Sequence, residues 1–112
     1  MENLLTVIFE AHHAALNHHR FYEVTIGRDL LDDWTVVIRY GRDGQGGQEK
    51  RFASPDPSVL RAIIRNRLRR RLTAPRRIGC SYRLVGSNAA PDYAAADWFP
   101  DDVMKQFGFD VT

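Results

Sequence analysis

The fold of this 112-residue chain is decided by the stretch WTVVIRYGRDGQGGQEKRFASPDPSVLRAIIRNRLRRR, residues 34–71. Its first part, residues 34–40, is rich in β-branched and aromatic side chains, which suit the pleated surface of a strand. Four glycines within residues 41–47 predict a tight connection. Residues 48–53 then offer a partner strand, so residues 34–53 are expected to form a β-hairpin.

A helix is predicted directly after this hairpin. Asp56 can cap its first turn, and Pro57 suits the first helical position. Apolar residues then recur at helical spacing, which gives the helix one apolar stripe. Pro75 ends the helix no later than about residue 73. The stripe consists of Leu60, Ile63, Ile64, Leu68 and Leu72.

Shorter patterns predict the remaining elements. Residues 20–26 alternate between two faces and predict a strand. The apolar run at residues 4–9 fits either a strand or a helix, and residues 77–84 predict a last short strand. Residues 10–19, EAHHAALNHH, are expected to form a loop. The fold class is therefore α+β, with a small antiparallel β-sheet and one packed α-helix in residues 1–85.

The C-terminal tail, residues 86–112, is acidic, with five acids and one lysine. Its start is small and polar like a linker, and a short helix is expected within residues 100–107. Trp98, Phe99 and Phe107 indicate docking, either onto the domain itself or onto a partner. Two arrangements are open for the acids: solvation, which is usual for a terminus, or contact with a basic face of the domain.

Positive charge is concentrated between residues 61 and 83, where nine arginines occur without any Asp or Glu. The formal net charge of the whole chain is only +2. Solvated helix faces usually mix both signs of charge, whereas this helix carries one sign after its capping residue. Arginine offers a planar fork that fits phosphate, and neutralising phosphates releases condensed counterions. We therefore expect a nucleic-acid contact surface here rather than a merely solvated face.

The hairpin and helix together resemble the WGR domain, a small module of several poly(ADP-ribose) polymerases and of stand-alone bacterial proteins. The tripeptide Tyr40-Gly41-Arg42 stands where the family has Trp-Gly-Arg, and the glycine-rich turn up to residue 48 matches as well. Residues 20–24 look like the first core strand of the family. The resemblance covers about residues 4–85.

This resemblance implies an antiparallel sheet with one packed helix, and it implies nucleic-acid binding. The motif aromatic, here Tyr40, would pack against the sugar–phosphate end, and Arg42 would make polar contacts. Tyrosine keeps a stacking face but lacks the indole N–H donor of tryptophan. The expected partner is DNA or RNA, contacted through its backbone. The candidate nucleic-acid-binding residues are Tyr40, Arg42, Arg61, Arg65, Arg69, Arg70, Arg76 and Arg77.

Other kinds of site find little support in the residues. No acid or cysteine sits at a known ligand spacing from the pairs His12-His13 and His18-His19, so we expect exposed histidines, no metal and no cofactor. No catalytic triad, metal box or nucleotide-binding loop is visible, which argues against an enzyme. The one cysteine, Cys80, excludes an internal disulfide. With no signal-peptide pattern and no membrane-spanning run, we expect a cytoplasmic protein.

Two functions remain open at this point. The first is a nucleic-acid-binding module, preferably for DNA, that holds the phosphate backbone with the arginine-rich helix and the Tyr-Gly-Arg hairpin. The second is a protein-interaction adaptor, in which the arginine face meets an acidic partner and the tail adds Trp98 and Phe99 as an apolar anchor.

Overall fold

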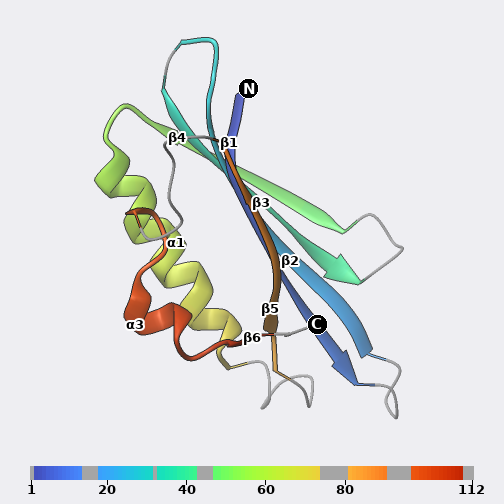
Figure 1. Cartoon of the computed structure of the whole chain (residues 1–112). Helices are drawn as coiled ribbons and strands as arrows, with labels where there is room; N and C mark the ends of the chain where they lie inside the picture. The colour runs from blue at the N-terminus through green and yellow to red at the C-terminus, as the bar shows by residue number, and fades with distance from the viewer. Residues whose placement is uncertain are drawn as a thin grey trace.

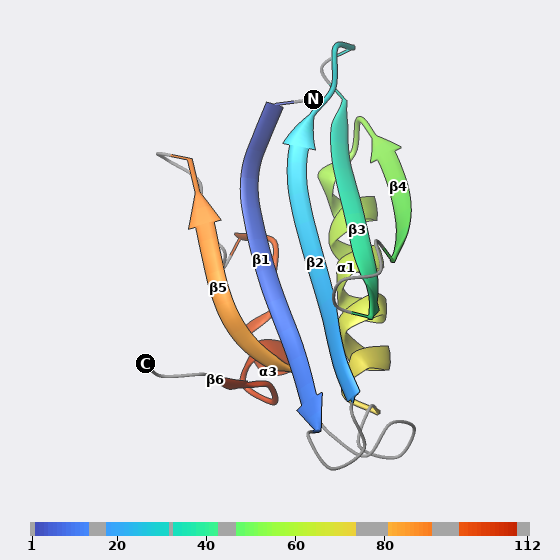
Figure 2. The ribbon, with the colours of Figure 1, turned by 90° about the vertical axis from the view of Figure 1, so that its right-hand side faces the viewer.

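One sheet with helices on a single face makes up the computed structural model, which describes residues 2–13, 18–31, 33–42, 47–73, 81–90 and 97–109. The sheet order is β4-β3-β2-β1-β5-β6 (Figure 2). Helices α1 (Pro57–Arg71) and α3 (Asp101–Met104) both cover the same face of this sheet (Figure 1). The strands are β1 (Glu2–His13), β2 (His18–Arg28), β3 (Trp34–Arg42), β4 (Gln48–Ser54), β5 (Arg83–Ala89) and β6 (Gly108–Phe109).

The expected α+β fold is confirmed. Strands β1 to β5 pair with antiparallel neighbours, and only the two-residue β6 adds to β5 in parallel. The predicted hairpin is the β3–β4 pair, in register from Trp34 opposite Ser54 to Tyr40 opposite Gln48. The apolar run at residues 4–9 belongs to a strand.

The prediction of a loop at residues 10–19 is wrong at both ends of this range, where the chain forms strands. Strand β1 continues to His13 and strand β2 starts at His18, so these ends pair with each other. Residues 14–17 lie outside the described part of the chain. The physical reason is the two-residue alternation of a strand: Ala11 is fully buried on the helix side, while the exposed His12 lies on the other side. Histidines are thus compatible with a half-solvated strand.

Helix α1 is positioned by its cap and by its apolar stripe. The Asp56 carboxylate accepts a hydrogen bond from the backbone N–H of Ser58 at 3.0 Å. This bond and one from the Ser58 hydroxyl hold the pKa of Asp56 below its ordinary value. Leu60, Ile64 and Leu68 are fully buried against the sheet, so the helix presents its arginines sideways and outward.

The C-terminal segment belongs to the same core. Strand β5 pairs with β1 up to Ala89, so residues 86–89 form a strand and not the expected linker. The predicted strand at 77–84 is seen only from Arg83, and residues 77–80 lie outside the described ranges. The core also includes four buried side chains from the segment around α3: Trp98, Phe99, Val103 and Phe107.

Ring contacts fix how this segment docks. Trp98 packs against Trp34 with ring centroids 5.0 Å apart, and Phe107 packs against Phe9 at 4.8 Å. Of the two arrangements open for the tail aromatics, docking onto the domain itself is the one that the structure has, and α3 lies within residues 100–107, where a short helix was expected. Neither described helix has the length and apolar character needed to span a membrane.

Candidate nucleic-acid interface

Two glycines shape the end of the β3–β4 hairpin next to Tyr40. Gly47 has φ +68° and Gly41 has φ +153°, a range that L side chains rarely adopt. A Cβ on Gly47 would collide with the carbonyl oxygen of Tyr40, and one on Gly41 would lie 2.6 Å from the Gly47 Cα. The close backbone approach lets the Tyr40 hydroxyl donate a hydrogen bond of 2.9 Å to the side-chain oxygen of Gln48.

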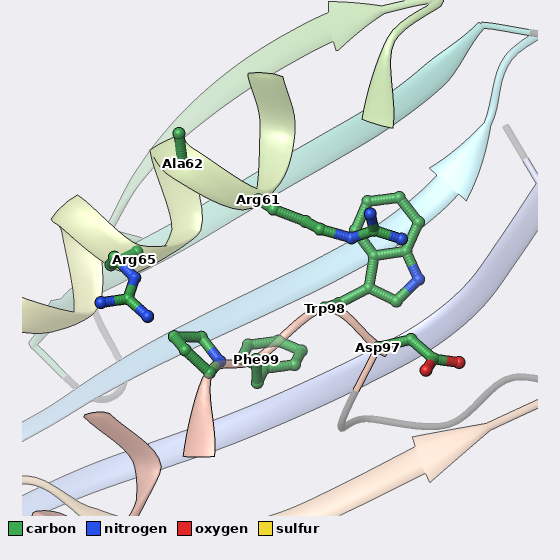
Figure 3. Close-up of a pocket in the computed structure, with 7 residues that line it drawn as sticks. Arg61, Ala62, Arg65, Asp97, Trp98 and Phe99 are labelled. Atoms are coloured by element: carbon green, nitrogen blue, oxygen red, sulfur yellow. The ribbon is translucent and has the colours of Figure 1, made fainter. Parts of the chain in front are cut away.

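The arginines of α1 lie on two flanks with different neighbours. On one flank, the two nitrogens of Arg65 donate bidentate hydrogen bonds to the Asp102 carboxylate, both at 3.1 Å. The guanidinium of Arg61 lies over the Trp98 ring, 5.0 Å from its centroid (Figure 3). Between α1 and the C-terminal segment is a cavity of about 360 Å³.

On this flank, two of the predicted nucleic-acid-binding residues already contact other parts of the chain. Arg65 is paired with an acid of the chain itself, and Arg61 packs on an aromatic side chain of the C-terminal segment. Of the two arrangements open for the acidic tail, contact with the basic helix is the one adopted by Asp102. The nine-arginine segment is therefore not one continuous cationic ridge.

The other flank of α1 faces the motif hairpin and forms a second cavity of about 450 Å³. Four of its lining residues are cations, and none of the lining residues that the structure describes is an acid. We refer to this site as the cationic pocket. It is lined by Tyr40, Lys50, Arg67, Arg70, Arg71 and Thr73.

Aromatic rings hold two of these cations in place. The guanidinium carbon of Arg71 lies 4.4 Å from the ring centroid of Tyr22 and 5.0 Å from that of Tyr40. Arg67 lies over Phe52 at 5.3 Å. A guanidinium over the face of an aromatic ring is stabilised without losing its charge. The pocket therefore keeps its positive charge on side chains with fixed positions.

Electrostatics at the base of the pocket follow from burial. Tyr22 is fully buried, which raises the pKa of its hydroxyl, and the charges of Arg71 and Arg67 partly oppose this rise. Arg71 comes close to the Tyr22 hydroxyl, but the geometry of a full hydrogen bond is not reached. Within the described residues, the buried Nε of Arg71 finds no hydrogen-bond acceptor.

The other predicted residues take different positions. Arg42 is exposed at the end of β3, two residues after Tyr40 and so on the same face of the sheet. Arg69 is exposed on α1 and lines none of the three cavities described beside this helix. Arg76 and Arg77 lie outside the described ranges. Among the predicted residues, the structure thus brings Tyr40 and Arg70 together, with Arg42 on the same face.

Four pocket residues were missing from the predicted set: the cations Lys50, Arg67 and Arg71, and Thr73. The signal for Lys50 was the alternation of β4, in which Gln48, Lys50 and Phe52 share the face toward the helix. The signal for Arg67 and Arg71 was their i,i+4 spacing on the flank that carries Arg70. Residue spacing along the helix did not predict which of its flanks would form the pocket.

Comparison with known proteins agrees with the hairpin and helix just described. A family model, the WGR domain, matches residues 5–62, which include most of β1, all of β2 to β4 and the start of α1. No curated protein and no solved structure matches the chain. The family is of nucleic-acid-binding type and is not catalytic by itself. Since the match spans more than half of the 112 residues, the chain belongs to the WGR domain family.

Proposed function

We propose that this chain binds nucleic acid, with DNA as the preferred ligand, by holding the phosphate backbone in the cationic pocket. The observation that carries the proposal is the gathering of Lys50, Arg67, Arg70 and Arg71 around Tyr40 of the family motif, with no acid among the described lining residues. Affinity would then come chiefly from phosphate neutralisation, so sequence preference would be low and added salt would weaken binding steeply.

The proposed contact set differs from that expected from sequence. Tyr40 and Arg70 remain at its centre, and Arg42 would extend it at the rim. Arg69 follows Arg65 by one helical turn, on the flank away from the cationic pocket, and stays a prediction. Arg61 and Arg65 would contribute little while the C-terminal segment engages them. Arg76 and Arg77 stay predictions.

A pair of neighbouring residues on β4 offers the sharpest test. Lys50 lies in the cationic pocket, whereas Arg51, the next residue, points to the opposite face of the sheet, and both are exposed. The variants Lys50→Glu and Arg51→Glu therefore make the same change of sign in different places. Affinity for labelled duplex, nicked duplex and single-stranded DNA, and for RNA, is measured by fluorescence anisotropy at two salt concentrations.

Lys50→Glu is expected to weaken binding about tenfold or more at low salt and to lower the salt slope by about 1. The affinity of Arg51→Glu is expected to stay close to that of the unmodified chain. Equal losses in both variants would point to a diffuse charge effect and contradict the pocket. Weak, salt-independent signals for all ligands would contradict nucleic-acid binding itself.

The adaptor hypothesis has lost one of its supports. Trp98 and Phe99 are only 5% and 1% exposed, so neither is presented as an apolar anchor for a partner. Binding of an acidic protein to the cationic pocket is its remaining form. A pulldown from nuclease-treated lysate separates the two functions, because only an adaptor retains its partner there. We also propose a reducing compartment, the cytoplasm, on the strength of the single cysteine.

A further inference from the structure

A second group of side chains that could bind a ligand lies on the face of the sheet that carries no helix. Its chemistry differs from that of the cationic pocket. Near the end of the β1–β2 hairpin, His12 stands directly opposite His19 across the strands. Glu10 precedes His12 by two residues and so lies on the same face. We call Glu10, His12 and His19 the histidine cluster. From the sequence we expected no acid or cysteine at a known ligand spacing from these histidines. The strand pairing brings His19 beside Glu10 and His12, a grouping that spacing along the chain does not show.

The donor atoms of the histidine cluster converge. One oxygen of Glu10 lies 3.5 Å from His12 Nε2, and the other lies 3.9 Å from His19 Nε2. The two imidazole rings have centroids 3.8 Å apart. One ligand atom from each of the three residues can be chosen so that all lie within 4.8 Å of one another.

We propose that the histidine cluster is a binding site for Zn²⁺ or a related divalent transition metal. With metal–ligand distances of about 2.0–2.1 Å, the donors of a tetrahedral zinc site lie about 3.3 Å apart. The two carboxylate–imidazole separations, 3.5 and 3.9 Å, lie close to this value, whereas the widest donor pair, at up to 4.8 Å, has to shorten further. Rotation of the exposed histidine side chains can supply this movement. Two imidazoles and one carboxylate are a ligand set that zinc uses when a fourth position is left for water.

The backbone explains why the set is already assembled. Cross-strand neighbours in an antiparallel pair hold their Cβ atoms about 4.5–5.5 Å apart, and the i,i+2 residue follows on the same face. The side chains of His12 and His19 are 51% and 46% exposed, so a metal can reach them and their replacement should leave the core intact.

The test is the zinc affinity of the full chain, which is stripped of metal and then titrated with zinc at about pH 7.5. A chromophoric chelator competes for the metal. We expect one zinc per chain, with affinity reduced more than about tenfold in each of Glu10→Gln, His12→Gln and His19→Gln. The matched control is Glu23→Gln, which removes a carboxylate from β2 outside the cluster and should bind zinc like the unmodified chain.

Thermal melts in chelator show whether each variant is folded before its affinity is compared. Cobalt absorption in the visible range provides a second measurement, since a tetrahedral site gives an intense band that the three variants should lose. Failure of the unmodified chain to bind zinc would overturn the site and leave a carboxylate between two exposed imidazoles. Retention of full affinity by any of the three variants would overturn the assignment equally.

Discussion

Gly47 illustrates how much a single residue decides at the motif hairpin. Its φ of +68° belongs to the left-handed region, and the space for a Cβ is taken by the Tyr40 carbonyl. The same turn brings Gln48 to the hydroxyl of Tyr40. A side chain at position 47 therefore disturbs both the backbone of β4 and the motif aromatic.

The variant Gly47→Ala is expected to lower the free energy of unfolding by about 1–3 kcal/mol, because the new Cβ strains the backbone and meets a carbonyl oxygen. Urea unfolding followed by fluorescence measures this change. Gly86→Ala is the control, since a Cβ at that position of β5 meets nothing within 4 Å. Comparable stability of the two variants would contradict the steric argument.

Tyr22 is expected to make the folding stability of the molecule decrease at alkaline pH. Burial raises the pKa of its hydroxyl above the ordinary value of about 10. Above that pH the unfolded chain releases the proton while the folded chain keeps it, so the stability contribution is complete below about pH 10 and is lost as pH rises through the folded pKa.

Tyr22→Phe should therefore lose less stability than the unmodified chain between about pH 8 and about pH 10.5. The free energy of unfolding in urea, measured at both pH values for both proteins, gives the comparison as a difference of differences. An equal alkaline loss in the two proteins would show that Tyr22 does not carry the effect.

At the scale of elements, α1 is one helix with two unlike sides. Its apolar stripe packs on the sheet, one flank is covered by the C-terminal segment, and the other stays open beside β4. Burial of Trp98, Phe99 and Val103 holds that segment in place. The Arg65–Asp102 pair is partly exposed, with side chains 40% and 60% accessible, so solvent screens it.

We expect Trp98→Ala to lower the free energy of unfolding by about 3–5 kcal/mol, because a large buried ring is replaced by a cavity. Asp102→Asn should cost only about 0.2–1 kcal/mol, as exposed ion pairs do. Denaturant titrations of the two variants decide between apolar and ionic docking. A loss in Asp102→Asn as large as that in Trp98→Ala would reverse this assignment.

At the scale of the whole molecule, the segment beyond residue 90 completes the core begun by the WGR strands. It supplies four buried side chains, and β6 extends the sheet beside β5. A folded domain has only about 5–15 kcal/mol of stability, and each buried large apolar side chain contributes about 1.5–3 kcal/mol.

A chain ending at residue 90 is therefore expected to be largely unfolded or to melt at a much lower temperature than the full chain. Circular dichroism during heating measures this, and dye binding reports exposed apolar surface. A synthetic peptide of residues 91–112 should restore part of the melting transition. A truncated chain with the melting temperature of the full chain would show that the core closes without the segment.

Much of the architecture was predictable, because local physics settles it. The hairpin at residues 34–53 was predicted by β-branched residues around a glycine turn, and α1 by its cap and stripe. The β1–β2 hairpin was only partly predictable, since its histidines look like loop residues until the partner strand is known. Within the candidate site, Tyr40 and Arg70 were predictable, whereas Lys50 and the fate of Arg61 and Arg65 were not.

The sequence by itself determined the α+β class, the position of the family motif and the concentration of positive charge on one helix. These depend on residue type and on spacing along the chain, which act over a few residues. Only the tertiary structure decided the neighbours of each arginine, because segments distant in sequence lie beside each helix flank. Trp98 and Asp102 of the C-terminal segment engage Arg61 and Arg65, and the motif hairpin and α1 gather Lys50, Arg67, Arg70 and Arg71 around Tyr40.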